Sequence, residues 1–376
     1  MNGRVDCFAV TAPGLAGLVA AELEGLAIAG DAPIEAGVSF KATLPELYSA
    51  NLHLRVASRI LVRLARFHAA HFSELADGAS KVSWERWLKP GTTVDLRVTC
   101  KKSRLYHSGA VAERLIEQLD RKGLQARVLK AEDDEGATPS QLLVVRVDRD
   151  ECTISIDSSG DLLHRRGYRK AVAKAPLRET LAAAMLSALC SNEASSLVDP
   201  MCGSGTIPIE AALLARRIAP GLRRHFAFEQ WVGFREGEWQ RLKEEAAERA
   251  LERAPAPIMG SDRDAGAVEA AVRNAERAGV SADIEFVQQS LSATTPPPGN
   301  PGLLIANPPY GERVSEGREL RDLYARFGDV ARRHFVGWSV GILAADPKLV
   351  SQTRLPLERR FSTTNGGIRV SLWAMG

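Results

Sequence analysis

The chain is poor in cysteine and has no long apolar run. Its five cysteines are scattered along 376 residues, are odd in number and include no Cys-x-x-Cys pair. This disfavours a zinc site and a disulfide framework and fits a reducing compartment. No run approaches the ~18 apolar residues that a membrane helix needs. Residues 7–21 loosely mimic a signal peptide, but Pro13 and Gly14 interrupt them. We therefore expect a cytoplasmic protein with no metal and no membrane attachment.

A large excess of charge is also missing, since the formal net charge is only +3. Two local stretches are nevertheless strongly basic: residues 101–107, and residues 162–178, which contain no acid but include an aromatic residue. Such stretches suit phosphate neutralisation and base stacking, although a solvated linker between domains would also fit the second one. The candidate RNA-binding residues are Lys101, Lys102, Arg104, Arg165, Arg166, Tyr168, Arg169, Lys170 and Arg178.

The N-terminal half has the pattern of two small α+β units. Residues 1–60 indicate a strand, a helix, a strand and a second helix. Apolar residues at helical spacing extend that second helix over 47–64, and we interpret the arginines between them as a solvated face. The second unit covers residues 90–157. Its expected elements are a strand at 93–98, a helix at 108–122 and strands at 142–147 and 152–157.

From about residue 176 onward, strand signals alternate with helical stretches, which predicts a parallel sheet. The end of the chain differs, because Asn365-Gly366 separates two strand-like runs and is a strong hairpin signal. The fold class is therefore α/β, with a mostly parallel sheet finished by an antiparallel hairpin. The strand signals lie at 257–261, 284–287, 303–306, 339–343, 359–364 and 368–375.

The first motif that carries chemistry follows a short strand and opens a helix. It reads Asp199-Pro200-Met201-Cys202-Gly203-Ser204-Gly205-Thr206. The two glycines allow a sharp turn and close approach of a ligand, and the helix N-terminus offers free N–H groups to a carboxylate. A phosphate-binding P-loop is excluded, because no Gly-Lys-Ser/Thr follows. A nicotinamide site is disfavoured, because the next acid at a strand end, Asp262, lies too far along the chain.

Two further loops follow strands in the same way. Asp262 can accept hydrogen bonds from both hydroxyls of a ribose, whereas Asp264 can cap the helix that begins near residue 265. Alternatively, both acids are ordinary helix caps. In the third loop, Asn307-Pro308-Pro309-Tyr310, the prolines stiffen a turn. The side-chain oxygen of Asn307 and the carbonyl of Pro308 can then accept the two hydrogens of an exocyclic amine, while Tyr310 stacks on the base.

These motifs carry a resemblance to a known family. Asn-Pro-Pro-Tyr and Asp-Pro-x-Cys-Gly-Ser-Gly-Thr resemble the fourth and first motifs of class I, S-adenosylmethionine-dependent amino methyltransferases. With the residues 163–169 and 175–180, the chain is similar to THUMP-containing guanine-N2 methyltransferases of bacterial 23S rRNA. The resemblance implies a ferredoxin-like part at 1–60, a THUMP RNA-binding domain at 61–158, a basic linker at 159–178 and a Rossmann-like catalytic domain at 179–376, acting as a monomer.

The resemblance also implies roles for individual residues. Asn307, Pro308, Pro309 and Tyr310 would be catalytic. The residues expected at S-adenosylmethionine are Asp199, Met201, Cys202, Gly203, Gly205, Thr206, Asp262, Arg263, Gln289, Ser290 and Asn307. The family usually has an acid after the third strand of the catalytic sheet to hold the adenine amine. This chain has none there, and Gln289 or Ser290 could accept the same hydrogen bond more weakly.

The target leaves alternatives open. Related enzymes methylate guanine in transfer RNA, and similar Asn-Pro-Pro-Tyr sites serve adenine N6 or protein glutamine, while a non-catalytic assembly factor would keep only the fold. All catalytic versions need one geometric condition. The loop at Asn307 and the glycine turn at 203–205 must share one pocket.

Overall fold

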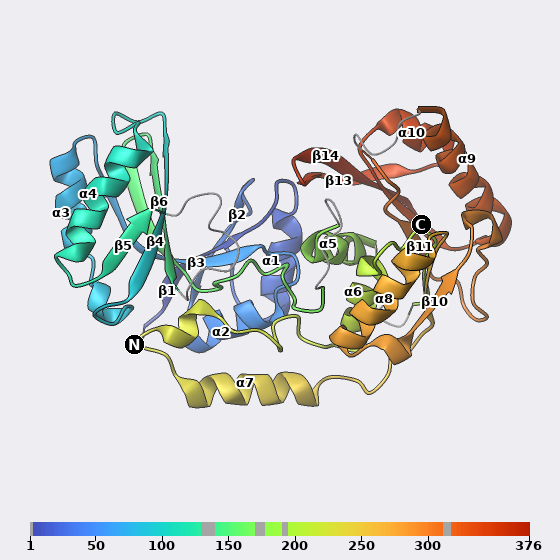
Figure 1. Cartoon of the computed structure of the whole chain (residues 1–376), viewed down its shortest axis with the longest axis horizontal. Helices are drawn as coiled ribbons and strands as arrows, with labels where there is room; N and C mark the ends of the chain where they lie inside the picture. Colours follow the sequence, from blue (N-terminus) through green and yellow to red (C-terminus); the bar gives the residue numbers. More distant parts are fainter. Residues whose placement is uncertain (1–2, 129–139, 170–176, 190–194, 311–316) are drawn as a thin grey trace.

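The computed structural model describes residues 3–128, 140–169, 177–189, 195–310 and 317–376. It contains two seven-stranded sheets, one in the N-terminal half and one in the C-terminal half (Figure 1). No helix among these residues is long and apolar enough to span a lipid bilayer.

The first sheet has the strand order β2-β1-β3-β7-β6-β4-β5. The first three strands and the last four belong to consecutive parts of the sequence, so the two N-terminal units form one continuous sheet. Its strands are β1 (Val5–Val10), β2 (Gly37–Ala42), β3 (Arg59–His68), β4 (Thr93–Lys101), β5 (Gln125–Val128), β6 (Gln141–Asp148) and β7 (Glu151–Asp157). Its helices are α1 (Ala16–Gly25), α2 (Leu44–His53), α3 (Phe72–Ser80), η1 (Trp84–Arg86) and α4 (Ser108–Asp120).

The prediction of a helix over residues 47–64 is wrong in its second half. A capping box between Thr43 and Glu46 starts α2, but the helix ends at His53, and β3 begins at Arg59. The run after Arg59 is rich in β-branched and other apolar residues, and β3 pairs with both β1 and β7. Burial on both sides of a central strand therefore outweighs the helical spacing of the apolar residues.

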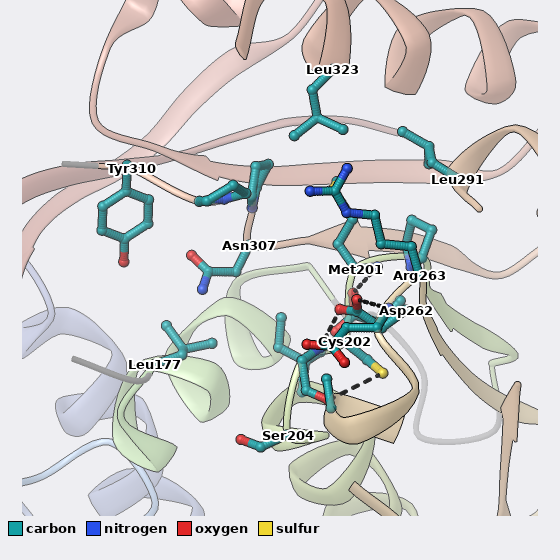
Figure 2. Close-up of a pocket in the computed structure, with 18 of the residues that line it drawn as sticks. Leu177, Met201, Cys202, Ser204, Asp262, Arg263, Leu291, Asn307, Tyr310 and Leu323 are labelled. Atoms are coloured by element: carbon teal, nitrogen blue, oxygen red, sulfur yellow. Dashed lines mark hydrogen bonds between the residues drawn. The ribbon is translucent and has the colours of Figure 1, made fainter. Parts of the chain in front are cut away.

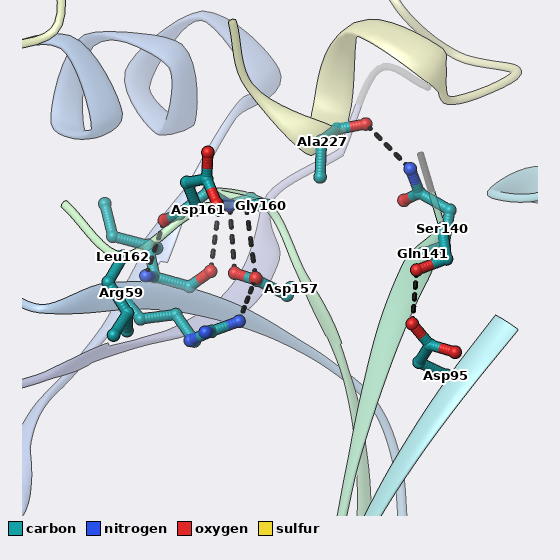
Figure 3. Close-up of polar contacts among 12 residues, drawn as sticks. Arg59, Asp95, Ser140, Gln141, Asp157, Gly160, Asp161, Leu162 and Ala227 are labelled. Carbon is teal, nitrogen blue, oxygen red and sulfur yellow. Dashed lines mark hydrogen bonds and ion pairs between the residues drawn. The ribbon is translucent and has the colours of Figure 1, made fainter. Parts of the chain in front are cut away.

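The junction between the two halves of this sheet is polar and buried. Arg59 of β3 pairs with Asp157 at the end of β7 (Figure 3). The same carboxylate accepts hydrogen bonds from the backbone N–H groups of Ser159 at 2.9 Å and Gly160 at 3.1 Å. Arg59 is therefore not part of a solvated face, because it neutralises a fully buried acid.

The second sheet has the order β10-β9-β8-β11-β12-β14-β13. The pairs from β10 to β12 are parallel, and β14 is antiparallel to both β12 and β13. The expected parallel sheet with a terminal hairpin is confirmed. Its strands are β8 (Leu197–Asp199), β9 (Ile258–Asp262), β10 (Ile284–Gln288), β11 (Leu303–Ala306), β12 (Ser339–Ala344), β13 (Glu358–Asn365) and β14 (Ile368–Met375).

Helices between the strands pack against this sheet (Figure 1). The turn of the hairpin is formed by Gly366 and Gly367, whose φ angles of +57° and +83° suit glycine. Asn365 is still paired with Ile368, so it closes the strand. The helices are α5 (Glu179–Leu189), α6 (Thr206–Ala215), η3 (Ala227–Gln230), α7 (Glu236–Glu248), α8 (Ala265–Ala278), η4 (Ser281–Asp283), η5 (Leu291–Ala293), α9 (Gly317–His334) and α10 (Pro347–Gln352).

The segment between α6 and β9 leaves the second sheet and packs on the N-terminal half. Helix α7 lies along α2, below the junction of the two halves in Figure 1. The ring of Tyr48 in α2 stacks on Phe228 at 4.4 Å between centroids, and Trp239 of α7 meets Phe228 edge-on at 5.2 Å. Gln141 of β6 also accepts a hydrogen bond from Trp231 at 2.9 Å. This aromatic cluster joins the two halves.

Candidate active site

The glycine turn lies between the end of β8 and the start of α6. Gly203 and Gly205 have φ angles of +53° and +83°, a region that favours glycine. A Cβ on Gly205 would lie 2.9 Å from the Cβ of Ala271, whereas a Cβ on Gly203 would meet no atom within 4 Å. Gly205 therefore allows α6 to pack closely against α8, and Gly203 leaves the backbone open to a ligand.

The carboxylate of Asp262 is held against this turn. Its Oδ2 accepts a hydrogen bond from the backbone N–H of Gly203 at 3.0 Å, and its Oδ1 accepts one from Asp264 at 3.0 Å. A carboxylate has about four lone-pair sites, so two remain for a ligand. Asp264 instead accepts from the N–H of Gly266 at 2.8 Å and is the N-cap of α8. The two acids therefore differ as expected from the sequence, with Asp264 as the cap.

The third loop follows β11. Asn307 is half-buried, and its Oδ1 is a buried acceptor that has no hydrogen-bond partner among the described residues. The side chain of Asn307 lies between Tyr310 on one side and the Asp262 turn on the other (Figure 2). The hydroxyl of Tyr310 accepts a hydrogen bond from Nδ2 of Asn365 at 2.7 Å.

Asn365 comes from the hairpin and was not identified as a site residue from the sequence. Its only signal there was the Asn-Gly pair, which indicates a turn and says nothing of a pocket. In the structure its side chain is buried, and it lines the same cavity as Asn307. The hairpin therefore contributes a wall of the site as well as finishing the sheet.

All three loops line one cavity of about 1210 Å³. The condition that Asn307 and the glycine turn share a pocket is confirmed, because Gly203 and Ser204 lie on its wall together with the Asn307 loop. Helix α9 closes the far side with Leu323 and Arg326. The predicted cofactor residues on the wall are Asp199, Met201, Cys202, Gly203, Thr206, Asp262, Arg263, Ser290 and Asn307.

Two predicted cofactor residues do not line the cavity. Gly205 packs beneath the turn, and Gln289 lies outside the wall, where its backbone N–H donates to the carbonyl of Asp262 at 3.0 Å. Ser290 is exposed on the wall beside Leu291. Of the two candidates for the missing acid, Ser290 is therefore the one in position.

Burial changes the protonation of groups at the base of the cavity. Burial raises the pKa of the Asp199 carboxyl to about 8; the N–H of Met201 opposes the rise, and the negative Asp262 adds to it. Burial likewise raises the pKa of the Cys202 thiol far above its ordinary value. Cys202 is therefore a neutral thiol at neutral pH and is not a nucleophile.

Part of the basic stretch at 162–178 is buried, which corrects two predicted RNA contacts. Arg166 is 5% exposed and donates to the carbonyls of Leu163 and Arg55, both at 2.6 Å. Tyr168 is 3% exposed and donates to Glu210 of α6 at 3.1 Å. Buried side chains with these partners join the N-terminal half to α6 and cannot lie on RNA in this conformation.

The remaining residues of the stretch differ among themselves. Arg169 is half-buried and donates to Thr206 at 2.6 Å, so it also has a structural partner. Arg165 and Arg178 are exposed, and Lys170 lies outside the described residues. The notion of a solvated linker is therefore wrong for Leu163, Arg166 and Tyr168, which are buried in the interface.

The other basic loop is exposed. Lys101, Lys102 and Arg104 are all exposed at the end of β4, and the ring of Tyr106 beside them is 73% exposed. The N–H of Arg104 donates to Asp150 at 2.7 Å, which fixes the loop against the β6–β7 turn. This end of β4 is a basic surface with one exposed aromatic ring, which lies 4.7 Å from the ring of His107.

Two family models match the chain. The model described as UPF0020, RMKL-like, methyltransferase domain, matches residues 166–372. The model described as the RlmL ferredoxin-like domain matches residues 6–61. The first match contains the whole second sheet except the end of β14, and the second contains β1 from its second residue, β2 and the start of β3.

Curated relatives match over nearly the whole chain. Ribosomal RNA large subunit methyltransferase K/L of Methylococcus capsulatus is 38% identical over 98% of this chain and 50% of its own length. The protein of the same name from Syntrophotalea carbinolica is 36% identical over 99% and 53%. The chain therefore spans about half the length of these relatives. A Synechocystis protein named as an RNA methyltransferase is 34% identical and is covered over 95% of its length.

Solved structures of two methyltransferases superpose on nearly the whole chain. The methyltransferase SMU.472, complexed with SAH, superposes with a TM-score of 0.88 at 29% identity, and the match covers 100% of this chain and 98% of that one. A Listeria monocytogenes protein described as an N6-adenine-specific DNA methylase superposes with a TM-score of 0.87 at 30% identity over 99% and 96%. The glycine turn, the Asp262 carboxylate and the Asn307 loop around one cavity thus occur in a chain that belongs to the UPF0020 family of RMKL-like methyltransferase domains.

Proposed function

We propose that the chain transfers a methyl group from S-adenosylmethionine to N2 of a guanine in 23S rRNA. The observation that carries the proposal is the buried Oδ1 of Asn307 after β11, an acceptor that has no partner in the part of the chain that the structure describes. Leaving a buried acceptor unsatisfied costs free energy, so such an atom indicates a ligand with a donor. An exocyclic amine on a base is a donor of this kind.

The cavity supports the presence of two ligands. Ordinary small-molecule sites occupy ~300–1,000 Å³, and this cavity of about 1210 Å³ is larger. Asp262 offers its remaining lone pairs to ribose hydroxyls, and the N-terminus of α6 offers N–H groups to a carboxylate. Ser290 would accept from the adenine amine. These groups fit S-adenosylmethionine at the glycine turn and leave the Asn307 side for a base.

The chemistry follows from the geometry of the third loop. When bound, S-adenosylmethionine supplies an activated methyl group, whose transfer forms an N–C bond, breaks the C–S bond and releases one proton from the amine. Asn307 Oδ1 and the Pro308 carbonyl would hold the two amine hydrogens and orient its lone pair. Both acceptors interact more strongly with the more positive amine of the transition state, so they favour turnover over simple binding. The ring of Tyr310 would stack on the base.

RNA binding is the part of the proposal that concerns the N-terminal half. We infer that residues 61–158 act as a THUMP domain and that the exposed Lys101, Lys102 and Arg104 contact phosphates. Arg165 and Arg178 are the exposed arginines among the described residues of the second stretch, and Arg178 follows Leu177 on the cavity wall. The names of the curated relatives favour large-subunit ribosomal RNA over transfer RNA. The cytoplasmic location and the monomeric state stay predictions.

The test is nucleoside mass spectrometry after incubation with S-adenosylmethionine and, in separate reactions, 23S rRNA or transfer RNA transcribed in vitro. We expect N2-methylguanosine with the wild-type chain. With Asn307→Ala, we expect turnover to fall by about 10²–10³-fold or more while cofactor affinity changes little. Gln288→Ala removes an exposed amide outside the cavity and should be neutral.

Other products would contradict parts of the proposal separately. Methylated transfer RNA alone would overturn the substrate, and N6-methyladenosine would overturn the base. Cofactor binding without any product would overturn catalysis by the chain. Near-wild-type turnover of Asn307→Ala would overturn the role of the amide.

A further inference from the structure

Asn365 offers a second unsatisfied acceptor to the same cavity. Its side chain is 4% exposed and lies on the cavity wall. Its Nδ2 donates to the hydroxyl of Tyr310 at 2.7 Å, and its Oδ1 has no hydrogen-bond partner among the described residues. The amide is thus held by one end, and the atom left without a partner is an acceptor.

The position of this amide is fixed by its surroundings. Asn365 is the last residue of β13 and is paired with Ile368 across the two-glycine turn. The bond to Tyr310 also links the hairpin to the loop that carries Asn307. With Nδ2 on the hydroxyl of Tyr310, Oδ1 is the end of the amide that is left for a ligand. The site therefore presents two amide oxygens, from Asn307 and Asn365, and neither has a donor within the described segments.

Two acceptors suit guanine and disfavour adenine. The Watson–Crick edge of guanine carries the N2 amine and, next to it, the N1–H, which are both donors. Adenine carries the N6 amine next to an unprotonated N1, which is an acceptor. If Asn307 takes the amine, an acceptor beside it gains a hydrogen bond from guanine and faces the N1 lone pair of adenine. A site built to accept a substrate hydrogen strongly rejects an analogue that lacks it.

We propose that Asn365 is a specificity-determining residue whose Oδ1 accepts the N1–H of the target guanine. This inference rests on the proposed function, because it assigns a further contact with the same base. It gives Asn365 a role distinct from that of Asn307, which holds the reacting amine. It also explains why a buried amide of the hairpin retains an unpaired oxygen.

The experiment removes the N1–H of the base and keeps its N2 amine. A synthetic RNA fragment carries either the guanine that is methylated in 23S rRNA or 2-aminopurine, which keeps the N2 amine but lacks O6 and has an unprotonated N1. We measure kcat/KM for both substrates with the wild type and with Asn365→Ala. We expect the wild type to prefer guanine by about 10- to 100-fold and the variant to lose most of that preference. Any intrinsic difference between the two amines cancels when the variant is compared with the wild type.

Thr363→Val is the matched control. Thr363 lies two residues earlier on β13 and is buried, and its hydroxyl also has no partner among the residues that the structure covers, but it does not line the cavity. Its substitution should leave the guanine preference unchanged. The affinity of each variant for S-adenosylhomocysteine, measured by calorimetry, shows whether the site is intact.

The outcomes are separable. The role of Asn365 would be overturned if the wild type showed no preference for guanine, or if Asn365→Ala retained that preference. If Asn365→Ala lost kcat/KM equally on both substrates, the role would also be overturned, and Asn365 would only support Tyr310. Absence of N2-methylguanosine with the wild type on 23S rRNA would overturn the proposed function, which is a different result.

Discussion

Arg169 Nη2 donates to the hydroxyl of Thr206 at 2.6 Å, at the first residue of α6. The same guanidinium lies 3.6 Å from the carboxylate of Glu179, the first residue of α5, and both groups are largely buried. One side chain from the segment before α5 thus connects the starts of two helices. Thr206 also lines the cavity, so the contact links the domain junction to the site.

Replacing Arg169 should destabilise the fold. Arg169→Met would leave the Glu179 carboxylate buried without its main cation, and we expect the free energy of unfolding to fall by about 2–4 kcal/mol. Urea denaturation followed by fluorescence measures the change. Arg165→Met is the control, because Arg165 is exposed and its partner Asp161 is exposed too, so a change within about 0.5 kcal/mol is expected. Equal effects of the two substitutions would contradict this account.

Cofactor affinity should depend on pH through Asp199. Its pKa of about 8 means that the carboxyl is mostly protonated at neutral pH. A cationic ligand favours the carboxylate, so binding should release a proton and strengthen as the pH rises toward about 8. Calorimetry at about pH 7 in two buffers with different ionisation enthalpies measures the released protons. Asp199→Asn should abolish the part of the release that comes from the protein, and an unchanged release would refute the assignment.

The two glycines of the turn should respond differently to substitution. Gly205→Ala would place a methyl group against Ala271 and adopt an unfavourable φ, and we expect a loss of about 2–4 kcal/mol in the free energy of unfolding. Gly203→Ala meets open space, so its cost should be nearer ~1 kcal/mol. Its added methyl group faces the cavity and should weaken cofactor binding. Thermal unfolding and calorimetry together separate the two effects, and a reversed order of stability would disprove them.

Ser290 should accept the hydrogen bond from the adenine amine that the resemblance assigns to an acid. Ser290→Ala removes an acceptor and should weaken cofactor binding by about 3- to 10-fold. Ser290→Asp supplies a charged acceptor and should strengthen it, because a carboxylate makes a stronger hydrogen bond than a hydroxyl. Gln289→Ala should have little effect, because Gln289 does not line the cavity. Fluorescence titration gives the three dissociation constants, and a larger effect at Gln289 would reverse the assignment.

The sequence predicted the loops of the candidate active site better than the contacts between the N-terminal and C-terminal halves. Loops that follow buried parallel strands must meet at one edge of a sheet, so Asp262 and Asn307 could be placed before the structure was known. The helix over 47–64 and the exposure of Arg166 and Tyr168 were wrong, because strand pairing and a partner such as Glu210 come from distant parts of the chain. Asn365 could not be found for the same reason. Its role depends on how a hairpin closes over a loop 55 residues away.

The aromatic cluster of Tyr48, Phe228 and Trp239 has a consequence for the order of synthesis. Tyr48 and Phe228 are fully buried, and Trp239 is 1% exposed, although the three belong to segments separated by about half of the chain. In a nascent chain that has been synthesised only to the end of β7, Tyr48 would lack the rings of Phe228 and Trp239 that bury it. The apolar surface around Tyr48 is therefore covered only after the residues up to Trp239 have been synthesised. A chain truncated before residue 166, where the methyltransferase family model begins, would leave this surface exposed and prone to aggregation.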